Sequence, residues 1–161
     1  MDQPSPFGVV PTTDGGVTLC PGCVSSRACQ IGMISQLVEG NGNSVAEIAC
    51  PRQFQGGPGV AFGGWVAMAF DHVFGAIPLK LGIGGLTVSL SVDYLKPVPV
   101  ETPLTLHAQA ADRTGRRWKF TGQLVLPDGS AAATARSELV EPAAHHFDRY
   151  RQAEPAPEAG V

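Results

Sequence analysis

The chain reads Phe54-Gln-Gly-Gly-Pro-Gly-Val-Ala-Phe-Gly-Gly-Trp-Val-Ala-Met-Ala-Phe-Asp-His-Val-Phe-Gly75, a glycine-rich loop that runs directly into an apolar segment with one carboxylate. Apolar residues cover nearly the whole circumference of a helix from Trp65 to Phe74, which is typical of a helix that the protein buries. Asp71 and His72 are the only titratable residues in this segment. Because desolvating an unpaired charge costs at least several kcal/mol, proteins keep such residues mostly at functional sites. The segment therefore indicates a catalytic site at Asp71.

On either side of this segment the residue pattern predicts strands. Before the loop, two apolar runs at 31–38 and 44–49 flank Glu39-Gly-Asn-Gly-Asn43, whose turn residues predict a hairpin. After the helix, expected at 63–79, apolar and polar residues alternate with a period of two, which indicates half-buried strands. The pattern predicts four of these strands from Leu86 to Val140, joined as an antiparallel meander.

One buried helix and about six strands predict an α+β domain in which the sheet curls around the helix to cover it. A flat sheet cannot enclose a single helix, so we expect a second subunit to complete an open edge or face. Residues 1–28, rich in Pro, Gly and Ser, are interpreted as an irregular arm, residues 29–141 as the folded domain and residues 142–161 as a mobile tail.

Length and charge exclude several classes of protein. With 161 residues the chain is one ordinary domain that needs no disulfide or metal to fold. Its net charge of -3 argues against a nucleic-acid-binding protein, which normally presents a strongly basic face. The N-terminus shows no basic region followed by an apolar core, and no segment approaches the ~20 apolar residues of a membrane span. We therefore expect a cytoplasmic protein without nucleic-acid or membrane partners.

The four cysteines leave two interpretations open. Cys20-Pro-Gly-Cys23, with Cys29 as a third thiolate, has the spacing of a metal site. A second close pair of ligands is missing, since the remaining cysteine is the distant Cys50. The pattern therefore favours free thiols in a reducing compartment over a structural zinc, and we expect no metal.

Phe54-Gln-Gly-Gly-Pro-Gly59, Phe62-Gly-Gly64 and Asp71 together resemble the Gly/Pro loop, the His-Gly-Gly motif and the helical acid of a known family. This family is the hotdog-fold acyl-CoA thioesterases, in the PaaI-like branch of the 4-hydroxybenzoyl-CoA thioesterase superfamily. Residues 87–97, Gly115-Arg-Arg117 and the Cys-Pro-Gly-Cys opening are similar to recurrent features of the same branch, so that the resemblance covers about residues 20–139. It implies a curved antiparallel β-sheet wrapped around one long central α-helix, and assembly as a homodimer or homotetramer.

The resemblance implies catalytic roles for three residues. Asp71 falls where the family has its catalytic carboxylate, Thr87 where a Ser or Thr helps to place the acid or its water, and Gly63 where a backbone N–H points at the thioester oxygen. The last role is physically sensible, because N–H groups at a helix N-terminus are unpaired within the helix and lie at its positive end. Gly63 and Asp71 are about 12 Å apart along the helix axis, too far to touch one carbonyl. The resemblance therefore implies that the acid reaches across a dimer interface.

Two positions depart from the family pattern. Phe62 stands where the usual His is found, and Gly56 where an Asn is often found, so both polar groups expected near the thioester carbonyl are absent. Electrophilic assistance would then rest on backbone N–H groups alone. The candidate substrate-binding residues combine this region with cations suited to the phosphates of coenzyme A: Gln55, Gly56, Phe62, Gly64, Lys96, Arg116 and Arg117. Beyond coenzyme A as part of the substrate, the resemblance implies no cofactor.

The first functional hypothesis is hydrolysis of an acyl-CoA thioester, with Asp71 as nucleophile or as general base on water. A non-catalytic acyl-CoA-binding protein on the same fold is the alternative, because the usual His is Phe62. Hydration of an acyl thioester is less favoured for the same reason. Each residue also has a structural interpretation: Asp71 could be a buried acid that pairs with His72 of the partner subunit, and Gly63 and Gly64 could serve tight helix packing.

Overall fold

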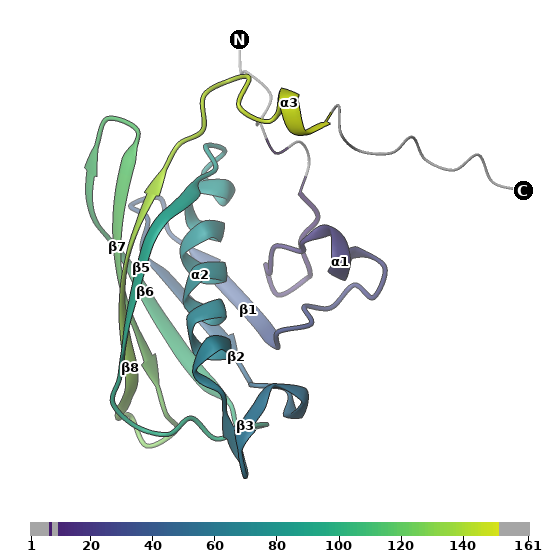
Figure 1. Ribbon diagram of the computed structural model, residues 1–161, viewed down its shortest axis with the longest axis vertical. Coiled ribbons are helices and arrows are strands. Elements are labelled where there is room, and N and C mark those ends of the chain that lie inside the picture. Colours follow the sequence, from purple (N-terminus) through teal and green to yellow (C-terminus); the bar gives the residue numbers. More distant parts are fainter. Residues whose placement is uncertain (1–6, 8–9, 152–161) are drawn as a thin grey trace, which may run out of the picture.

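The computed structural model describes residue 7 and residues 10–151, and Figure 1 shows a curved sheet wrapped around one long helix. Six antiparallel strands form the sheet in the order β1-β2-β6-β7-β8-β5. Their bounds are β1 Met33–Val38, β2 Ser44–Ile48, β5 Leu86–Tyr94, β6 Leu104–Thr114, β7 Arg117–Val125 and β8 Ala131–Val140. A separate ribbon pairs β3, Gln55–Gly57, with β4, Val60–Ala61. This architecture confirms the expected α+β domain.

Helix α2, Gly63–Lys80, lies within the curve of the sheet. It begins after Phe62, whose backbone is extended, and ends one residue beyond the expected range. The ring of Phe70 stacks on Phe74 with centroids 5.8 Å apart, and Phe74 stacks on Phe120 of β7 at 5.7 Å. The face of the helix that packs on the sheet is fully or almost fully buried and consists of Trp65, Val66, Ala69, Phe70, Val73, Phe74 and Ile77. Burial of this apolar face stabilises the domain, because the hydrophobic effect scales with the apolar area removed from water.

The strand order corrects the expected four-stranded meander. Strands β6, β7 and β8 are consecutive neighbours, but β5 pairs with β8 at one edge of the sheet and β6 pairs with β2. The connection 95–103 contains Pro97 and Pro99, which cannot donate to a strand ladder, while Val98 and Val100 within it are buried. The chain therefore crosses the end of the sheet here instead of turning back beside β5.

A second correction concerns the burial of α2. The apolar pattern predicted a helix covered on nearly all sides, but the sheet encloses only one side of it. Within the described chain, Met68 is 36% exposed and Asp71 is exposed as well. We call Gly64, Met68, Asp71 and Gly75 the open stripe, because they repeat at helical spacing on the uncovered side. Glycine and methionine count as apolar in a sequence pattern, which is why this side resembles a core face.

The arm before β1 packs beside α2 and β1. Its residues Pro21–Val24 form a short helix, α1, which Figure 1 shows on the side of α2 that faces away from β7 and β8. Val17 of the arm is fully buried. The Lys80 ammonium at the end of α2 donates hydrogen bonds to the carbonyls of Gly16 in the arm and Gln36 in β1. These contacts fasten the arm to both elements.

The described part of the tail, residues 142–151, ends in the short helix α3, Asp148–Arg151. Phe147 packs edge-on against Phe7, with ring centroids 5.0 Å apart. Residues 152–161 lie outside the described residues, so the expectation of a mobile tail, like the domain bounds 29–141, stays a prediction. In the described part of the chain, no helix has both the length and the apolarity needed to cross a lipid bilayer. The cytoplasmic location also stays a prediction.

A substitution at Gly122 in β7 tests how closely α2 packs against the sheet. A Cβ at Gly122 would lie 2.9 Å from Phe74 Cζ and 3.1 Å from Phe70 Cε1. We expect Gly122→Ala to displace both rings and to lower the free energy of unfolding by about 1–3 kcal/mol, the usual range for overpacking. Gly40→Ala is the control, because nothing lies within 4 Å of a Cβ at Gly40. Urea denaturation that gives both variants the same stability would contradict this packing.

Candidate active site

Asp71 lies on the open stripe of α2, where the edge strand β5 passes beside the helix. The Thr87 hydroxyl of β5 donates a hydrogen bond of 2.7 Å to Asp71 Oδ1. Both residues are exposed in the single chain, and Asp71 Oδ2 has no hydrogen-bond partner among the residues that the structure describes. Thr87 thus orients the carboxylate while one carboxylate oxygen stays available. The structure brings together two of the three residues expected to be catalytic.

The exposure of Asp71 corrects the expectation of a carboxylate inside a fully buried helix. Because water reaches the side chain in the single chain, desolvation does not single it out there. What distinguishes Asp71 is its hydrogen bond to Thr87, which fixes its orientation. Thr87 itself could be selected from the sequence only through the family resemblance, since a threonine on a half-exposed strand carries no signal of its own.

His72, the neighbour of Asp71 in sequence, faces a different environment. Its Nε2 is buried and has no hydrogen-bond partner among the described residues. Burial lowers the pKa of the imidazole, the nearby Asp71 carboxylate acts in the opposite direction, and the Lys80 charge lowers the pKa again. No hydrogen bond joins His72 to Asp71 within the described chain, so the ring does not replace the imidazole that is absent at position 62.

The start of α2 combines two glycines with two aromatic rings. The Tyr94 hydroxyl donates a hydrogen bond of 2.8 Å to the Gly63 carbonyl, and its ring would lie 3.3 Å from a Cβ at Gly63. A Cβ at Gly64 would collide with the ring of Phe62. Close packing therefore accounts for both glycines. Tyr94 was not among the expected site residues. Its partner Gly63 lies 31 residues away on another element, and the strand pattern does not indicate this hydrogen bond.

The N–H groups of Gly63 and Gly64 remain available for a ligand. The helix has no side-chain cap at its N-terminus, and the first N–H groups of an α-helix have no partner inside it. They lie at the positive end of the helix dipole and can hold a developing oxyanion. Gly63 and Asp71 are about 12 Å apart along the axis of the same helix. One chain therefore holds two separate half-sites.

Phe62 and Gly56, the two departures from the family pattern, lie against each other. Phe62 is 42% exposed and stacks on Phe54, with ring centroids 6.2 Å apart. A Cβ at Gly56 would lie 2.7 Å from Phe62 Cβ and 2.8 Å from Phe62 Cα. Because the second of these atoms is backbone, an Asn at position 56 does not fit this loop conformation. The glycine at position 56 and the path of the loop are thus consistent with each other.

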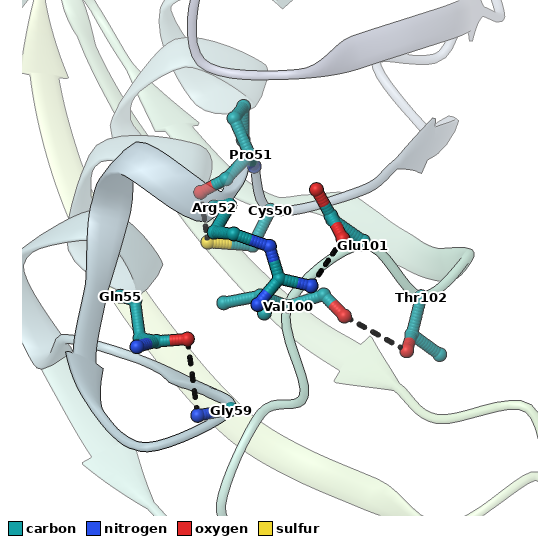
Figure 2. Close-up of polar contacts among 8 residues, drawn as sticks. All are labelled: Cys50, Pro51, Arg52, Gln55, Gly59, Val100, Glu101 and Thr102. Carbon is teal, nitrogen blue, oxygen red and sulfur yellow. Dashed lines mark hydrogen bonds and ion pairs between the residues drawn. The ribbon is translucent and has the colours of Figure 1, made fainter.

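Figure 2 shows how the glycine-rich loop is held in place. Gln55 Oε1 accepts a hydrogen bond of 3.1 Å from the Gly59 N–H, so its amide oxygen is used inside the loop. At the base of the loop, Arg52 forms an ion pair of 2.5 Å with Glu101. The Glu101 N–H donates to the Cys50 carbonyl at 2.8 Å. These bonds tie the loop to the connection between β5 and β6.

Of the three cations expected to bind the phosphates of coenzyme A, Lys96 lies near the helix start. It lines a surface hollow of about 320 Å³ together with Gly63 and Tyr94. Lys96 is exposed, so its ammonium can reach a phosphate outside the hollow. The structure therefore places one expected phosphate-binding residue beside one expected oxyanion donor.

Arg116 and Arg117 lie at the turn between β6 and β7, at the opposite end of the sheet. In the register of the sheet, Arg117 pairs with Val140 of β8, and Val140 pairs with Leu86 at the start of β5. Tyr94 lies at the other end of β5. Arg117 also forms an ion pair with Glu138. Within one chain these two arginines are thus separated from the helix start.

An apolar cavity of about 490 Å³ lies between the open stripe and the arm. Asp71, Gly75 and Leu79 of α2 line one side, and Leu19 and Val24 of the arm line another. This cavity could not be predicted from the sequence, because the arm has no periodic pattern and its contacts with α2 join distant parts of the chain. The cavity places apolar volume directly beside the candidate catalytic carboxylate.

Cys20 and Cys23 of the arm lie close together. Cys20 Sγ and Cys23 Sγ are 3.5 Å apart, and Cys23 Sγ accepts the N–H of Gln30 at 3.4 Å. All four cysteines are free, and burial raises the pKa of Cys50 to about 11. Among residue 7 and residues 10–151, no group of three or more His, Cys, Asp or Glu side chains is placed to hold a metal ion.

Comparisons with known proteins find one matching family profile and several similar folds. The sequence profile of the Thioesterase superfamily matches residues 58–133. The chain is similar to the Escherichia coli PaaI protein from the phenylacetic acid degradation operon (19% identity, 74% of this chain and 85% of that chain covered, TM-score 0.63). It is also similar to a hypothetical thioesterase from Streptococcus pneumoniae TIGR4 with coenzyme A (19%, 66% and 88%, 0.60). A third likeness is to smu.793 from Streptococcus mutans UA159 bound to acetyl CoA (17%, 68% and 86%, 0.61). No curated protein matches the sequence.

These comparisons agree with the architecture of the chain. The matched residues 58–133 include α2, β5, β6 and β7, and with them both Asp71 and Thr87. The protein has the hotdog fold, with one long helix inside a curved antiparallel sheet. Its resemblance to the hotdog-fold thioesterases is confirmed.

The buried His72 predicts how stability changes with pH. Burial lowers the pKa of His72 in the folded state from its usual value of 6.5. Below about pH 6.5 the unfolded state therefore binds more protons than the folded state. The free energy of unfolding therefore decreases on acidification from about pH 7 to about pH 5. His72→Asn cannot take up this proton, so urea unfolding should show a shallower decrease than in the unmodified protein. Identical slopes for the two proteins would show that His72 does not contribute.

Proposed function

We propose that this protein hydrolyses an acyl-CoA thioester to the free acid and coenzyme A. The observation that carries the proposal is the hydrogen bond from Thr87 to Asp71, which holds an accessible carboxylate in one orientation on the open stripe. A carboxylate with one available oxygen can act as a nucleophile or as a general base. The resemblance to hotdog-fold thioesterases supplies the class of substrate.

The spacing between an aspartate and a threonine in a structurally similar protein supports the roles proposed for Asp71 and Thr87. Two further structures of the Streptococcus pneumoniae protein carry alanine in place of an aspartate and of a threonine, and these two positions are 16 residues apart. Asp71 and Thr87 are likewise 16 residues apart. That protein has a structure with coenzyme A, and the Streptococcus mutans protein has one with acetyl CoA. An aspartate and a threonine at the same spacing on the same fold favour a site for CoA thioesters here.

The proposed active site needs a second copy of the chain, because Gly63 and Asp71 of one helix cannot reach the same carbonyl. Strand β5 is an edge strand, and Val88, which follows Thr87, is 52% exposed. An unpaired edge with apolar side chains favours pairing with another strand. A homodimer, alone or within a homotetramer, would set Gly63 beside the partner subunit's Asp71. Closed two-fold assemblies are the most common form of homo-oligomer.

In this arrangement the Gly63 N–H would hold the thioester oxygen as negative charge develops on it. As nucleophile, Asp71 would attack the carbonyl carbon, expel coenzyme A as a thiolate and leave a mixed anhydride for water to hydrolyse. As general base, it would take a proton from the water that attacks the same carbon. Single turnover in ¹⁸O-water tests for the anhydride route, since label enters Asp71 only when water attacks the Asp71 carbonyl of that anhydride. Lys96 beside Gly63 would bind a phosphate of coenzyme A.

Asp71→Asn tests the proposed function directly. Release of the thiol from a panel of acyl-CoA esters can be followed with Ellman's reagent. We expect kcat/KM for the best ester to fall at least about 100-fold, because an amide is neither a base nor a nucleophile here. Thr87→Val should lower it roughly tenfold through the lost hydrogen bond to the carboxylate, and Thr87→Ser should restore it. Full turnover by Asp71→Asn would overturn the proposal.

Gly63→Pro tests the proposed oxyanion donor, because proline has no N–H. Proline fits the first position of a helix, and Phe62 already has the extended backbone, with ψ of 153°, that a residue before proline adopts. Gly63→Ala is the matched control, since it keeps the N–H and meets the same Tyr94 ring. We expect kcat of the proline variant to be about 10²–10³ lower than that of the alanine variant. Equal values would mean that the oxyanion is held elsewhere.

The same variants test the shared site. When Gly63→Pro and Asp71→Asn chains are unfolded, mixed and refolded together, each mixed dimer has one site with an intact Gly63 and an intact Asp71. Thiol release by the mixture is therefore expected to rise well above that of either variant alone. Failure to rise, with mixed dimers present, would place both groups of a site in one chain.

A non-catalytic acyl-CoA-binding protein is the second candidate, and the exposed Phe62 favours it. Phe62 brings an apolar ring to the position where the family pattern has a His, and the loop leaves no room for an Asn at Gly56. Binding of acyl-CoA in calorimetry together with no thiol release from any ester would support this candidate over hydrolysis.

A further inference from the structure

Gly75 lies in the interior of α2, one turn after Asp71 on the open stripe. Glycine is the least favourable residue in a helix interior apart from proline, so its presence there needs a reason. At Gly63 and Gly64 the reason is an aromatic ring, but nothing lies within 4 Å of a Cβ built at Gly75. Packing within the described chain therefore does not require a glycine at this position.

The open space over Gly75 belongs to the cavity of about 490 Å³ between α2 and the arm. This volume falls within the range of roughly 300–1,000 Å³ that is usual for small-molecule sites. Asp71 and Leu79 both line the cavity, so it extends about 12 Å along the helix. Most of the lining is apolar and includes Val10, Leu19, Val24, Gly75, Ala76 and Leu79. Phe7, Thr18 and His72 also line it, and Thr18 Oγ1 and His72 Nε2 are buried without a hydrogen-bond partner among the described residues.

The wall that the arm contributes is fastened to the rest of the chain. Leu19 is 5% exposed, so the wall is itself part of a packed structure. The Gln36 N–H of β1 donates a hydrogen bond of 2.9 Å to the carbonyl of Gly15. The Lys80 ammonium donates to the carbonyl of the next residue, Gly16. The cavity is therefore formed before any ligand binds.

We propose that this cavity binds the acyl group of the substrate, and that the substrates are medium-chain aliphatic acyl-CoA esters. The inference rests on the proposed function. The thioester would lie at Asp71, and the chain would run along α2 over Gly75 towards Leu79. Apart from Asp71, no Asp, Glu, Lys or Arg of the described chain lines the cavity, so a charged acyl group would lose its hydration there without gaining an oppositely charged partner. An acetyl group would leave most of the cavity empty.

The test compares Gly75→Leu with Gly40→Leu in the full chain. Both glycines have open space at Cβ, but Gly40 lies in the turn between β1 and β2, outside the cavity. We expect kcat/KM for octanoyl-CoA to fall at least tenfold in Gly75→Leu, while kcat/KM for acetyl-CoA stays within about threefold, because the leucine fills space that only the longer chain uses. Gly40→Leu should change neither value. The Tm of Gly75→Leu should equal or exceed that of the unmodified protein, since leucine favours the helix.

Direct binding separates this inference from the proposed function. In Asp71→Asn protein, calorimetry should show that adding Gly75→Leu weakens octanoyl-CoA binding at least about tenfold and leaves the binding of free coenzyme A unchanged. If the unmodified protein releases thiol from no ester, the proposed function fails, but this difference in binding would still uphold the acyl site. Equal loss for octanoyl-CoA and acetyl-CoA, or no loss for either, would overturn it. Dissociation of the Gly75→Leu oligomer on size-exclusion chromatography would also overturn it, by assigning Gly75 to a subunit contact.

Discussion

The packing of one face of α2 against the sheet is the constraint on which the rest of the structure depends. The stacked rings of Phe70, Phe74 and Phe120 set the rotation of the helix about its axis, and the small Gly122 lets the helix approach the strands. Once this face is fixed, the helical repeat of 3.6 residues leaves Asp71 on the opposite side. The position of the carboxylate is thus decided by the aromatic core beneath it.

The local elements could be predicted from the sequence, while their arrangement could not. The hairpin at 33–48 follows from two apolar runs around turn residues, and the helix follows from a continuous apolar segment after the glycine-rich loop. The strands after residue 86 follow from a period of two, and all three signals depend only on neighbouring residues. The place of β5 beside β8 depends on the connection 95–103, where buried Val98 and Val100 carry the chain across the end of the sheet. Such a long-range choice leaves no periodic pattern in the strands themselves.

The site was predictable to a different degree at each residue. Asp71 could be selected because a lone carboxylate in an apolar segment is unusual. The prediction that it is buried was wrong, because glycine and methionine on the open stripe count as apolar in a sequence pattern. The hydrogen bond of Tyr94 to Gly63 and the open space over Gly75 could not be found from the sequence, because each depends on chain segments that meet only after folding. A sequence pattern can thus identify an unusual residue such as Asp71, but only the tertiary structure identifies the residues that contact it.

The fastening of the arm by Lys80 has a kinetic consequence. The hydrogen bond from Lys80 to the Gly16 carbonyl joins residues separated by 64 positions. Closing so long a loop costs chain entropy, whereas the hairpin and the helix form from neighbouring residues, so we expect this contact to form after those local elements. When the hydrogen bonds of Lys80 break, the arm can detach while the strands of the sheet stay paired. Its detachment would remove one wall of the cavity beside Asp71 while the paired strands of the sheet stay intact. Slow exchange of backbone amide hydrogens in the sheet can therefore coexist with rapid exchange in the arm.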